Sequence, residues 1–224
     1  MSPISLIQLP KSPQTELKLL PREEYGFTKN HDPMRIYFWP LVGKLFRRRV
    51  EYCLDQCQGG EKILEVGFGS GATFLALNEK YKHIYGIDLD TDVEAVENLY
   101  ERYHINHNLK IGNLIDLPYE ENTFDTVLLI SILEHVKPID LQQAMGEIKR
   151  VLKVGGQMVY GVPIERPLMR IGFWFLGYDI RKHHFSTENQ VRTEAEKYFN
   201  NGHILRMPLF HNAFGCSYEI ASFY

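Results

Sequence analysis

The stretch Ile63-Leu64-Glu65-Val66-Gly67-Phe68-Gly69-Ser70-Gly71 decides the fold of this chain. It starts as a short apolar strand, turns through three glycines and continues into residues 72–81, whose pattern is typical of a helix. Glycine permits a tight turn at such a place and lets a ligand approach the backbone, because no Cβ stands in between. The start of the helix adds free N–H groups and the positive end of the helix dipole. The stretch therefore predicts a strand–turn–helix unit that suits a nucleotide-like ligand.

Apolar runs alternate with helix-like segments along the rest of the chain. The runs that predict strands are residues 62–66, 83–87, 109–112, 124–130 and 157–162. Helices are predicted after Pro40, over 92–103, from Leu141 to a stop at Gly155-Gly156, and over 188–200. Strands this apolar, separated by helices, predict an α/β fold with a mostly parallel sheet covered on both faces. The later runs 204–209 and 216–223 predict an antiparallel pair at its edge.

Composition narrows the class of protein. The chain has 224 residues, of which 44% are hydrophobic and 24% charged, so it is long enough for one buried domain with a modest appendage. A net charge of −3 argues against nucleic-acid partners, which require a basic footprint. No run approaches the roughly 20 apolar residues of a membrane span, and we expect a cytoplasmic protein. Cys53 and Cys57 lie on the apolar stripe of a predicted helix, and no metal site is expected.

The glycine turn alone fits two ligand classes. It matches the dinucleotide pattern G-x-G-x-x-A, and Asp88 lies 21 residues after Gly67, where a carboxylate accepts ribose hydroxyls in a site for NAD or for S-adenosylmethionine (SAM). Glu65 favours SAM, because a carboxylate gains nothing beside a pyrophosphate but suits the ammonium group of the methionine end. Gly71 completes the pattern E-x-G-x-G-x-G. A solvated strand end remains the alternative interpretation of Glu65.

Further motifs follow in an order that resembles one family. They are the first stretch, Gly86-Ile87-Asp88-Leu89-Asp90, residues 112–119, Asn122-Thr123-Phe124-Asp125, Leu133-Glu134-His135-Val136 and residues 150–156. Together they resemble the class I SAM-dependent methyltransferases, in particular the small-molecule branch with the quinone-biosynthesis methyltransferases. The resemblance implies a Rossmann-like, seven-stranded sheet that ends in an antiparallel C-terminal hairpin, with helices on both faces.

The resemblance also implies which residues bind SAM, whose product is S-adenosylhomocysteine. The methionine and ribose parts would lie along Glu65, Gly67, Gly69 and Gly71, with Asp88 on the ribose hydroxyls. The remaining contacts would be Leu89 against the adenine, Asn113 and Leu114 at the adenine edge, and Ser131 beside the methionine part. Asn113 departs from the family, which often has aspartate there, but an amide oxygen also accepts from the adenine amino group.

A base is not marked as clearly. His135 follows the fourth strand of the domain, at the end where open α/β sheets bind ligands, and it titrates near neutrality. We take it as the candidate general base, with a loop hydrogen bond as the alternative role. His184 is a second candidate, although the pair His183-His184 also reads as a surface pair.

Two aromatic segments bear on the acceptor. We divide the chain into an N-terminal arm over residues 1–40 and a domain over 41–224, whose insertion at 163–190 covers the substrate in this family. Tyr37 and Trp39 in the arm, with Phe173 and Trp174 in the insertion, would contact a small, lipid-like acceptor, or else pack on one another. Arginines and lysines flank both segments, so shallow attachment to an anionic membrane is a further hypothesis.

Residues 131–134 read Ser-Ile-Leu-Glu and lack the Asn/Asp-Pro-Pro-aromatic tetrad of enzymes that methylate planar amino groups. The sequence therefore favours transfer to oxygen or carbon over nitrogen. Two other functions stay open: an NAD-type oxidoreductase that shares the glycine turn, and a catalytically silent SAM-binding protein that works through a partner. Nothing in the sequence indicates the oligomeric state.

Overall fold

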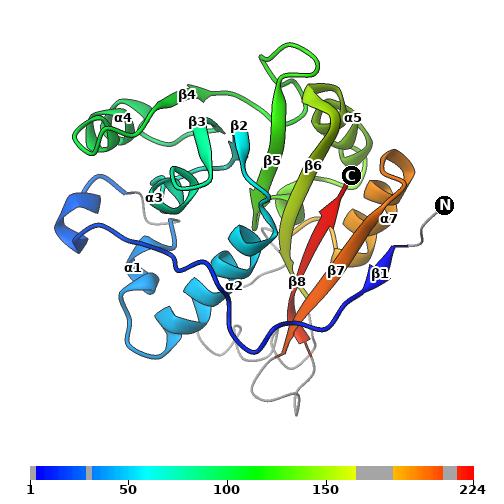
Figure 1. The fold of residues 1–224 in the computed structure, drawn as a ribbon, viewed down its shortest axis with the longest axis horizontal. Coiled ribbons are helices and arrows are strands. Elements are labelled where there is room, and N and C mark those ends of the chain that lie inside the picture. Colours follow the sequence, from blue (N-terminus) through cyan, green and yellow to red (C-terminus); the bar gives the residue numbers. More distant parts are fainter. Residues whose placement is uncertain (1–3, 29–31, 165–183, 209–215) are drawn as a thin grey trace.

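The computed structural model describes residues 4–28, 32–164, 184–208 and 216–224. Its centre is an eight-stranded sheet in the order β1-β7-β8-β6-β5-β2-β3-β4 (Figure 1). The strands are β1 (Ser5–Leu6), β2 (Gly60–Val66), β3 (Tyr81–Asp88), β4 (His107–Ile111), β5 (Phe124–Ile130), β6 (Leu152–Pro163), β7 (Gly202–Pro208) and β8 (Cys216–Phe223). Only β8 runs antiparallel to its neighbours, β6 and β7. The predicted mostly parallel sheet with an antiparallel C-terminal hairpin is therefore confirmed, but β1 adds an eighth strand to the seven that the resemblance implies.

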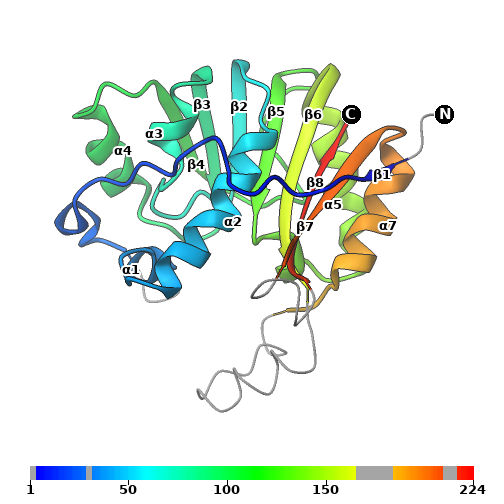
Figure 2. The same cartoon turned by 60° about the horizontal axis from the view of Figure 1, so that its bottom comes forward.

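Helices cover both faces of this sheet, which forms the middle layer. Over one face lie α2 (Val42–Gln56), α3 (Phe74–Leu77), α4 (Val93–Glu101) and the N-terminal segment, whose apolar side chains share one core cluster. The other face carries α5 (Leu141–Val151) and α7 (Glu188–Tyr198), which form a second cluster with it. Figure 2 shows the two layers on opposite sides of the strands. Among the described residues no helix has both the length and the apolarity that crossing a bilayer would demand.

The N-terminal arm is more ordered than a simple extended arm. It adds the parallel edge strand β1 to β7, then crosses the α2 face to the 3-10 helix η1 (Arg22–Tyr25) beside α4 (Figure 2). Along this path the Tyr52 hydroxyl donates to the Pro10 carbonyl at 2.9 Å, and the Tyr25 hydroxyl lies 3.5 Å from that of Tyr100. Leu17 is buried in the α2-side core. The arm thus closes one face of the sheet, and η1 leads to α1 (Met34–Tyr37) at the carboxyl ends of the parallel strands.

Two predicted helices are shorter in the structure than the pattern indicated. The helix expected over 72–81 forms regular α-helix only at α3, because Tyr81 already pairs with Gly60 as the first residue of β3. The helix that starts at Leu141 ends at Val151 instead of Gly155, because Leu152 pairs with Phe124 in the sheet. A register shift between β5 and β6 then takes up residues 153–156. Strand pairing outweighs helical pattern at both places.

One ion cluster holds α7 onto the terminal hairpin. The Glu219 side chain is fully buried and accepts from Arg192 of α7 at 2.6 Å and from Arg206 of β7 at 3.2 Å. Burial raises the pKa of Glu219, although both arginines act in the opposite direction. The carboxylate therefore depends on its partners, because a buried charge without them is costly.

We expect Arg192→Met to destabilise the protein by about 2 kcal/mol or more, because buried Glu219 would keep only one of its two arginines, with the Tyr160 hydroxyl bond. Urea unfolding measures the free energy. The matched control is Lys197→Met on the same helix, since the Lys197–Glu194 pair is largely exposed on the lysine side. That control should change stability by less than about 0.5 kcal/mol. Equal effects of the two changes would contradict the role given to the buried cluster.

Candidate functional site at the carboxyl edge of the sheet

The predicted donor-site residues gather at one edge of the sheet. Strands β5, β2, β3 and β4 are neighbours and parallel, so their carboxyl ends lie side by side. The glycine turn follows β2, Asp88 ends β3, Asn113 follows β4 and Ser131 follows β5. Open α/β sheets bind ligands at this edge, where the helices after adjacent strands depart to opposite faces.

The turn after β2 requires glycine for two separate reasons. Gly67 has φ +72° and Gly71 has φ +69°, a backbone region that other residues rarely adopt. A Cβ on Gly67 would also lie 2.0 Å from Cδ1 of Ile132, and one on Gly71 would lie 2.6 Å from the ring of Tyr100. The turn is held from below, because the Gly67 N–H donates to the Ile87 carbonyl at 2.7 Å. Its shape is therefore fixed before any ligand binds.

Glu65 is a buried carboxyl group inside the sheet. Only 4% of the residue is exposed, and its side chain accepts a short hydrogen bond from the Thr73 hydroxyl. Burial raises the pKa of Glu65 to about 8, the Thr73 bond lowers it, and the negative charge of Asp88 adds to the rise. The interpretation of Glu65 as a solvated strand end is thus wrong, because a residue of the central strand β2 is covered on both sides.

Asp88 organises the loops on either side of it. One oxygen accepts the Gly69 N–H at 2.9 Å, and the other accepts the N–H groups of Asp90 at 3.1 Å and Thr91 at 3.2 Å. The Thr91 hydroxyl in turn donates to the Gly69 carbonyl at 2.8 Å. A carboxylate offers about four acceptor positions, so these three bonds leave room for a hydroxyl group of a ligand.

The predicted adenine contacts differ in their surroundings. The Leu89 side chain is 68% exposed beside the carboxyl end of β3, whereas Leu114 is buried in the core. The Asn113 side-chain oxygen accepts the Ile115 N–H at 3.2 Å. Leu89 is therefore the side chain that offers an open apolar surface to a flat ring, and Leu114 supports the loop from beneath.

Ser131, predicted beside the methionine part of the donor, directly follows β5. It has φ +57°, an uncommon value for a residue other than glycine, and such backbone strain concentrates at functional sites. Its hydroxyl lies 2.8 Å from that of Tyr218 on β8. The guanidinium of Arg49 on α2 lies over the Tyr218 ring at 5.5 Å and over Phe46 at 4.1 Å, and its buried Nε has no hydrogen-bond partner among the described residues. Ser131, Tyr218 and Arg49 thus link three elements next to β5.

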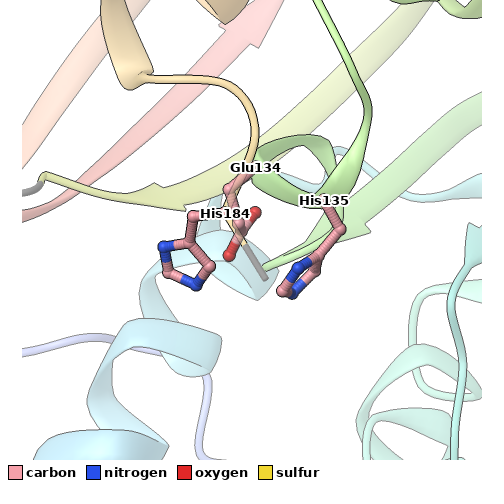
Figure 3. Close-up of side chains that lie close together, drawn as sticks. All are labelled: Glu134, His135 and His184. Atoms are coloured by element: carbon pink, nitrogen blue, oxygen red, sulfur yellow. The ribbon is translucent and has the colours of Figure 1, made fainter. Parts of the chain in front are cut away.

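The structure brings His135 and His184 together. His135 lies in the 3-10 helix η2 (Leu133–His135) and His184 precedes α7, yet their ring centroids are 5.2 Å apart at a steep angle. The buried Glu134 carboxyl group points toward the same place, as Figure 3 shows. The Phe185 and Ser186 N–H groups both donate to the Glu134 carbonyl, at 2.8 and 3.1 Å, which fixes one segment against the other. His184 is therefore not a detached surface residue, while His183 lies outside the described residues.

The four predicted acceptor contacts differ in burial, and two of them lie outside the described residues. Tyr37 is buried, and burial raises its pKa while Arg49 lowers it. Trp39 is 54% exposed. Phe173 and Trp174 lie outside the described residues, as does most of the insertion. In the basic segment before Cys53, the Arg48 guanidinium donates to the Lys11 carbonyl at 2.9 Å, so Arg48 as well as Arg49 is engaged by the chain itself.

Sequence reasoning missed three residues that border this edge. Arg49 was read only as part of a basic flank, and Glu134 only as part of a motif. Asp32 was not singled out, yet its carboxylate would lie 3.0 Å from a Cβ on Gly69. In the sequence, Asp32 is marked only by the proline that follows it, and Arg49 only by the neighbouring arginines. Neither pattern indicates the direction of the side chain. The predicted burial of Cys53 and Cys57 is confirmed.

Comparison with known proteins agrees with this geometry. Residues 64–160 match the methyltransferase domain family. An uncharacterized protein of Methanocaldococcus jannaschii is 36% identical over 97 residues, which are 43% of this chain and 38% of that protein. A demethylmenaquinone methyltransferase of Shouchella clausii is 36% identical over 136 residues, 58% of this chain and 57% of that enzyme. The match thus spans about half or less of the length of these curated relatives.

Two solved structures share the fold. The N-methyltransferase NodS of Bradyrhizobium japonicum, in complex with S-adenosyl-L-homocysteine, superimposes with a TM-score of 0.64 at 16% identity, covering 90% of this chain and 96% of NodS. A protein of Pyrococcus horikoshii gives a TM-score of 0.64 at 18% identity, covering 86% of this chain and 95% of that protein. These two likenesses concern the fold, whereas the family match covers the turn, Asp88 and the β5 end. Residues 64–160 thus carry a methyltransferase domain, and its matched relatives resemble the class I SAM-dependent enzymes.

Proposed function

We propose that this protein transfers a methyl group from SAM to an oxygen or carbon atom of a small apolar acceptor with a quinol-like ring. The observation that carries the proposal is the place of the Glu134, His135 and His184 side chains. Glu134 and His135 lie two and three residues after Ile132, whose side chain packs against Gly67 of the donor turn. His184 lies beside His135. A group able to take up a proton therefore adjoins the turn that would hold the methyl donor.

The residues present fit SAM. No positive side chain contributes to the pKa of the Glu65 carboxyl group, which lies just before the turn. The ammonium group of SAM would therefore stabilise its charged form. Asp88 retains acceptor capacity for ribose hydroxyls, and Leu89 offers an open apolar surface to the adenine. Because Gly67 and Gly71 lack a Cβ, Ile132 and Tyr100 pack directly on the turn and fix the backbone along which SAM would lie. NAD would place a pyrophosphate near Glu65, which offers that anion no positive partner.

The chain's own residues would align the acceptor and remove its proton. When bound, SAM supplies a methyl group on a positively charged sulfur, which leaves its bonding electron pair on that sulfur. The attacking oxygen or carbon provides the electron pair of the new bond, and the proton that it loses would pass to the group around His135. Alignment lowers the barrier because it removes the entropy cost of bringing two reactants together. Proton removal by a positioned side chain adds roughly 10²–10⁴-fold.

The acceptor class rests on two supports. Demethylmenaquinone methyltransferases from several bacteria are 31–36% identical to this chain over their matched part, so a quinol-like ring is a natural substrate class to test. Beyond Ser131, the aromatic side chains of Tyr218, Phe46 and Tyr37 also surround the Arg49 guanidinium. The unpartnered Nε of Arg49 in this apolar setting suits an acceptor oxygen, because buried polar groups require a hydrogen bond.

Transfer of label from methyl-tritiated SAM to reduced 1,4-naphthoquinone tests the function directly. We expect labelled product in the organic phase, and His135→Gln should lower the rate by about 100-fold or more while S-adenosylhomocysteine binding stays unchanged. A full rate in His135→Gln would contradict proton removal at this place. Binding of NADH without binding of S-adenosylhomocysteine would overturn the proposed function in favour of an oxidoreductase.

Glu65 predicts a proton release on donor binding. With a pKa of about 8 the free carboxyl group is mostly protonated at pH 7, and the ammonium group of SAM should return its pKa below 7. Binding at pH 7 should therefore release close to one proton, and this release should disappear as the pH rises above 8. Titration calorimetry of SAM in buffers of different ionisation enthalpy measures it. Glu65→Gln should bind more weakly and release none, whereas an unchanged proton release would contradict this role.

The stability of the free protein should carry the same signature. The folded pKa of Glu65 lies above its unfolded value of about 4.3, so the folded state binds more protons between these values. Its contribution to stability is then complete at low pH and is lost as the pH rises toward 8. Thermal unfolding of wild type and Glu65→Gln between pH 5 and 9 measures the difference, which should favour the variant increasingly toward high pH.

Arg49 should act on the acceptor and not on SAM. We expect Arg49→Met to raise the acceptor KM about tenfold, because one hydrogen bond to a partly buried oxygen is worth about 1.4 kcal/mol. Arg48→Met is the matched control on the neighbouring position, since Arg48 contacts the Lys11 carbonyl instead. Steady-state kinetics at saturating SAM separates the two. Equal KM values for Arg49→Met and Arg48→Met would contradict the assignment.

A further inference from the structure

We infer that Glu134, His135 and His184 form a binding site for a divalent transition-metal ion. The three residues each offer one ligand atom, and these atoms all lie within 4.8 Å of one another. They come from two segments that are about 50 residues apart in the chain, yet they point toward one place in the structure (Figure 3). No other described residues form such a group of three or more His, Cys, Asp and Glu ligands.

The backbone holds the ligands in position. The His135 N–H donates to the Ile132 carbonyl at 2.9 Å, which closes the turn that carries Glu134 and His135. The residues after His184 are tied to the same turn, through the two N–H bonds to the Glu134 carbonyl and a 2.6 Å bond from the Ser186 hydroxyl to the Val136 carbonyl. A site built on such fixed elements loses little entropy when an ion binds.

The donor set selects the class of ion. Two imidazoles and one carboxylate suit zinc and other first-row transition ions, whereas magnesium and calcium favour oxygen ligands alone. Tetrahedral bonding at about 2.0–2.1 Å places neighbouring ligand atoms about 3.3 Å apart. Side-chain movements that shift each ligand atom by roughly 1 Å would bring the three ligand atoms to that spacing. Their exposure is graded from buried Glu134 to exposed His135, which leaves one side open.

The open side gives the ion a role in methyl transfer, and this step rests on the proposed function. An ion with three protein ligands has at least one coordination position left for an outside oxygen. An acceptor hydroxyl bound there would lose its proton near neutral pH, because the positive ion lowers its pKa. The resulting oxygen anion then carries the electron pair that attacks the methyl group. With the ion bound, His135 would act on the acceptor through the metal and the released proton would pass to solvent, whereas without the ion His135 itself would take up the proton.

Zinc titration of the full chain tests the site without any need for activity. Using ZnCl₂ in calorimetry, and CoCl₂ as a visible-absorption probe of coordination, we expect one ion per chain. His135→Gln and His184→Gln should each weaken binding at least tenfold, and the double variant should abolish it. His83→Gln is the matched control, because His83 contacts Asn106 near the start of β3, at the opposite edge of the sheet. It should bind zinc as the wild type does.

The results separate the site from the proposed function. The inference is overturned if the wild type binds zinc no more tightly than the double variant, or if His83→Gln weakens binding as much as His135→Gln does. Glu134→Gln should also weaken binding, and the two histidine variants keep the test valid if that buried change prevents folding. Methyl transfer by a protein that binds no metal would contradict the metal site and leave the proposed function intact. Metal binding without S-adenosylhomocysteine binding would contradict the proposed function and leave the metal site intact.

Discussion

The rest of the site depends on a turn in which no Cβ is tolerated. Gly67 and Gly71 hold backbone angles that disfavour other residues, and the volume of their absent side chains is taken by Ile132 and Tyr100. This close contact brings the loop after β5 against the turn after β2. It also draws α4 toward the turn, because the Tyr100 hydroxyl donates to the Gly71 carbonyl at 2.6 Å. One local constraint thus fixes how two faces of the sheet meet at its carboxyl edge.

Burial sets the electrostatics of that edge. Glu65 and Glu134 are both nearly inaccessible, at 4% and 3% exposed, and a carboxyl group in such surroundings gains from a positive partner. The two differ in what adjoins them: Glu65 faces the donor turn with Asp88 nearby, whereas Glu134 shares its place with two histidines. An organic ammonium suits the first and a metal ion the second. The two proposed ligands would thus meet the same physical need at two places on this edge.

Much of this could be predicted from the sequence, but unevenly. The hydrophobic period and the positions of the glycines predict every strand from β2 to β8 at nearly the right place in the chain. The same pattern predicts the hairpin of β7 and β8. The donor residues are also local, since Glu65, the glycines and Asp88 occupy one strand–turn–helix–strand unit. The pattern fails where pairing competes with it, as at Tyr81 and Leu152. It gives no sign that the N-terminal segment adds β1, because Ser5 and Leu6 find their partner about 200 residues later.

The acceptor half could not be derived in this way, because its parts meet only through long-range packing. Tyr37, Arg49, His184 and Tyr218 come from four separate segments, and all of them lie outside residues 64–160, the part that matches the methyltransferase domain family. Within that part, Ser131, Glu134 and His135 are the residues that border the proposed acceptor side. The shared domain therefore specifies the methyl donor. We therefore propose that the arm, α2 and the residues around α7 and β8 decide what receives the methyl group, since these elements meet the domain beyond its matched part.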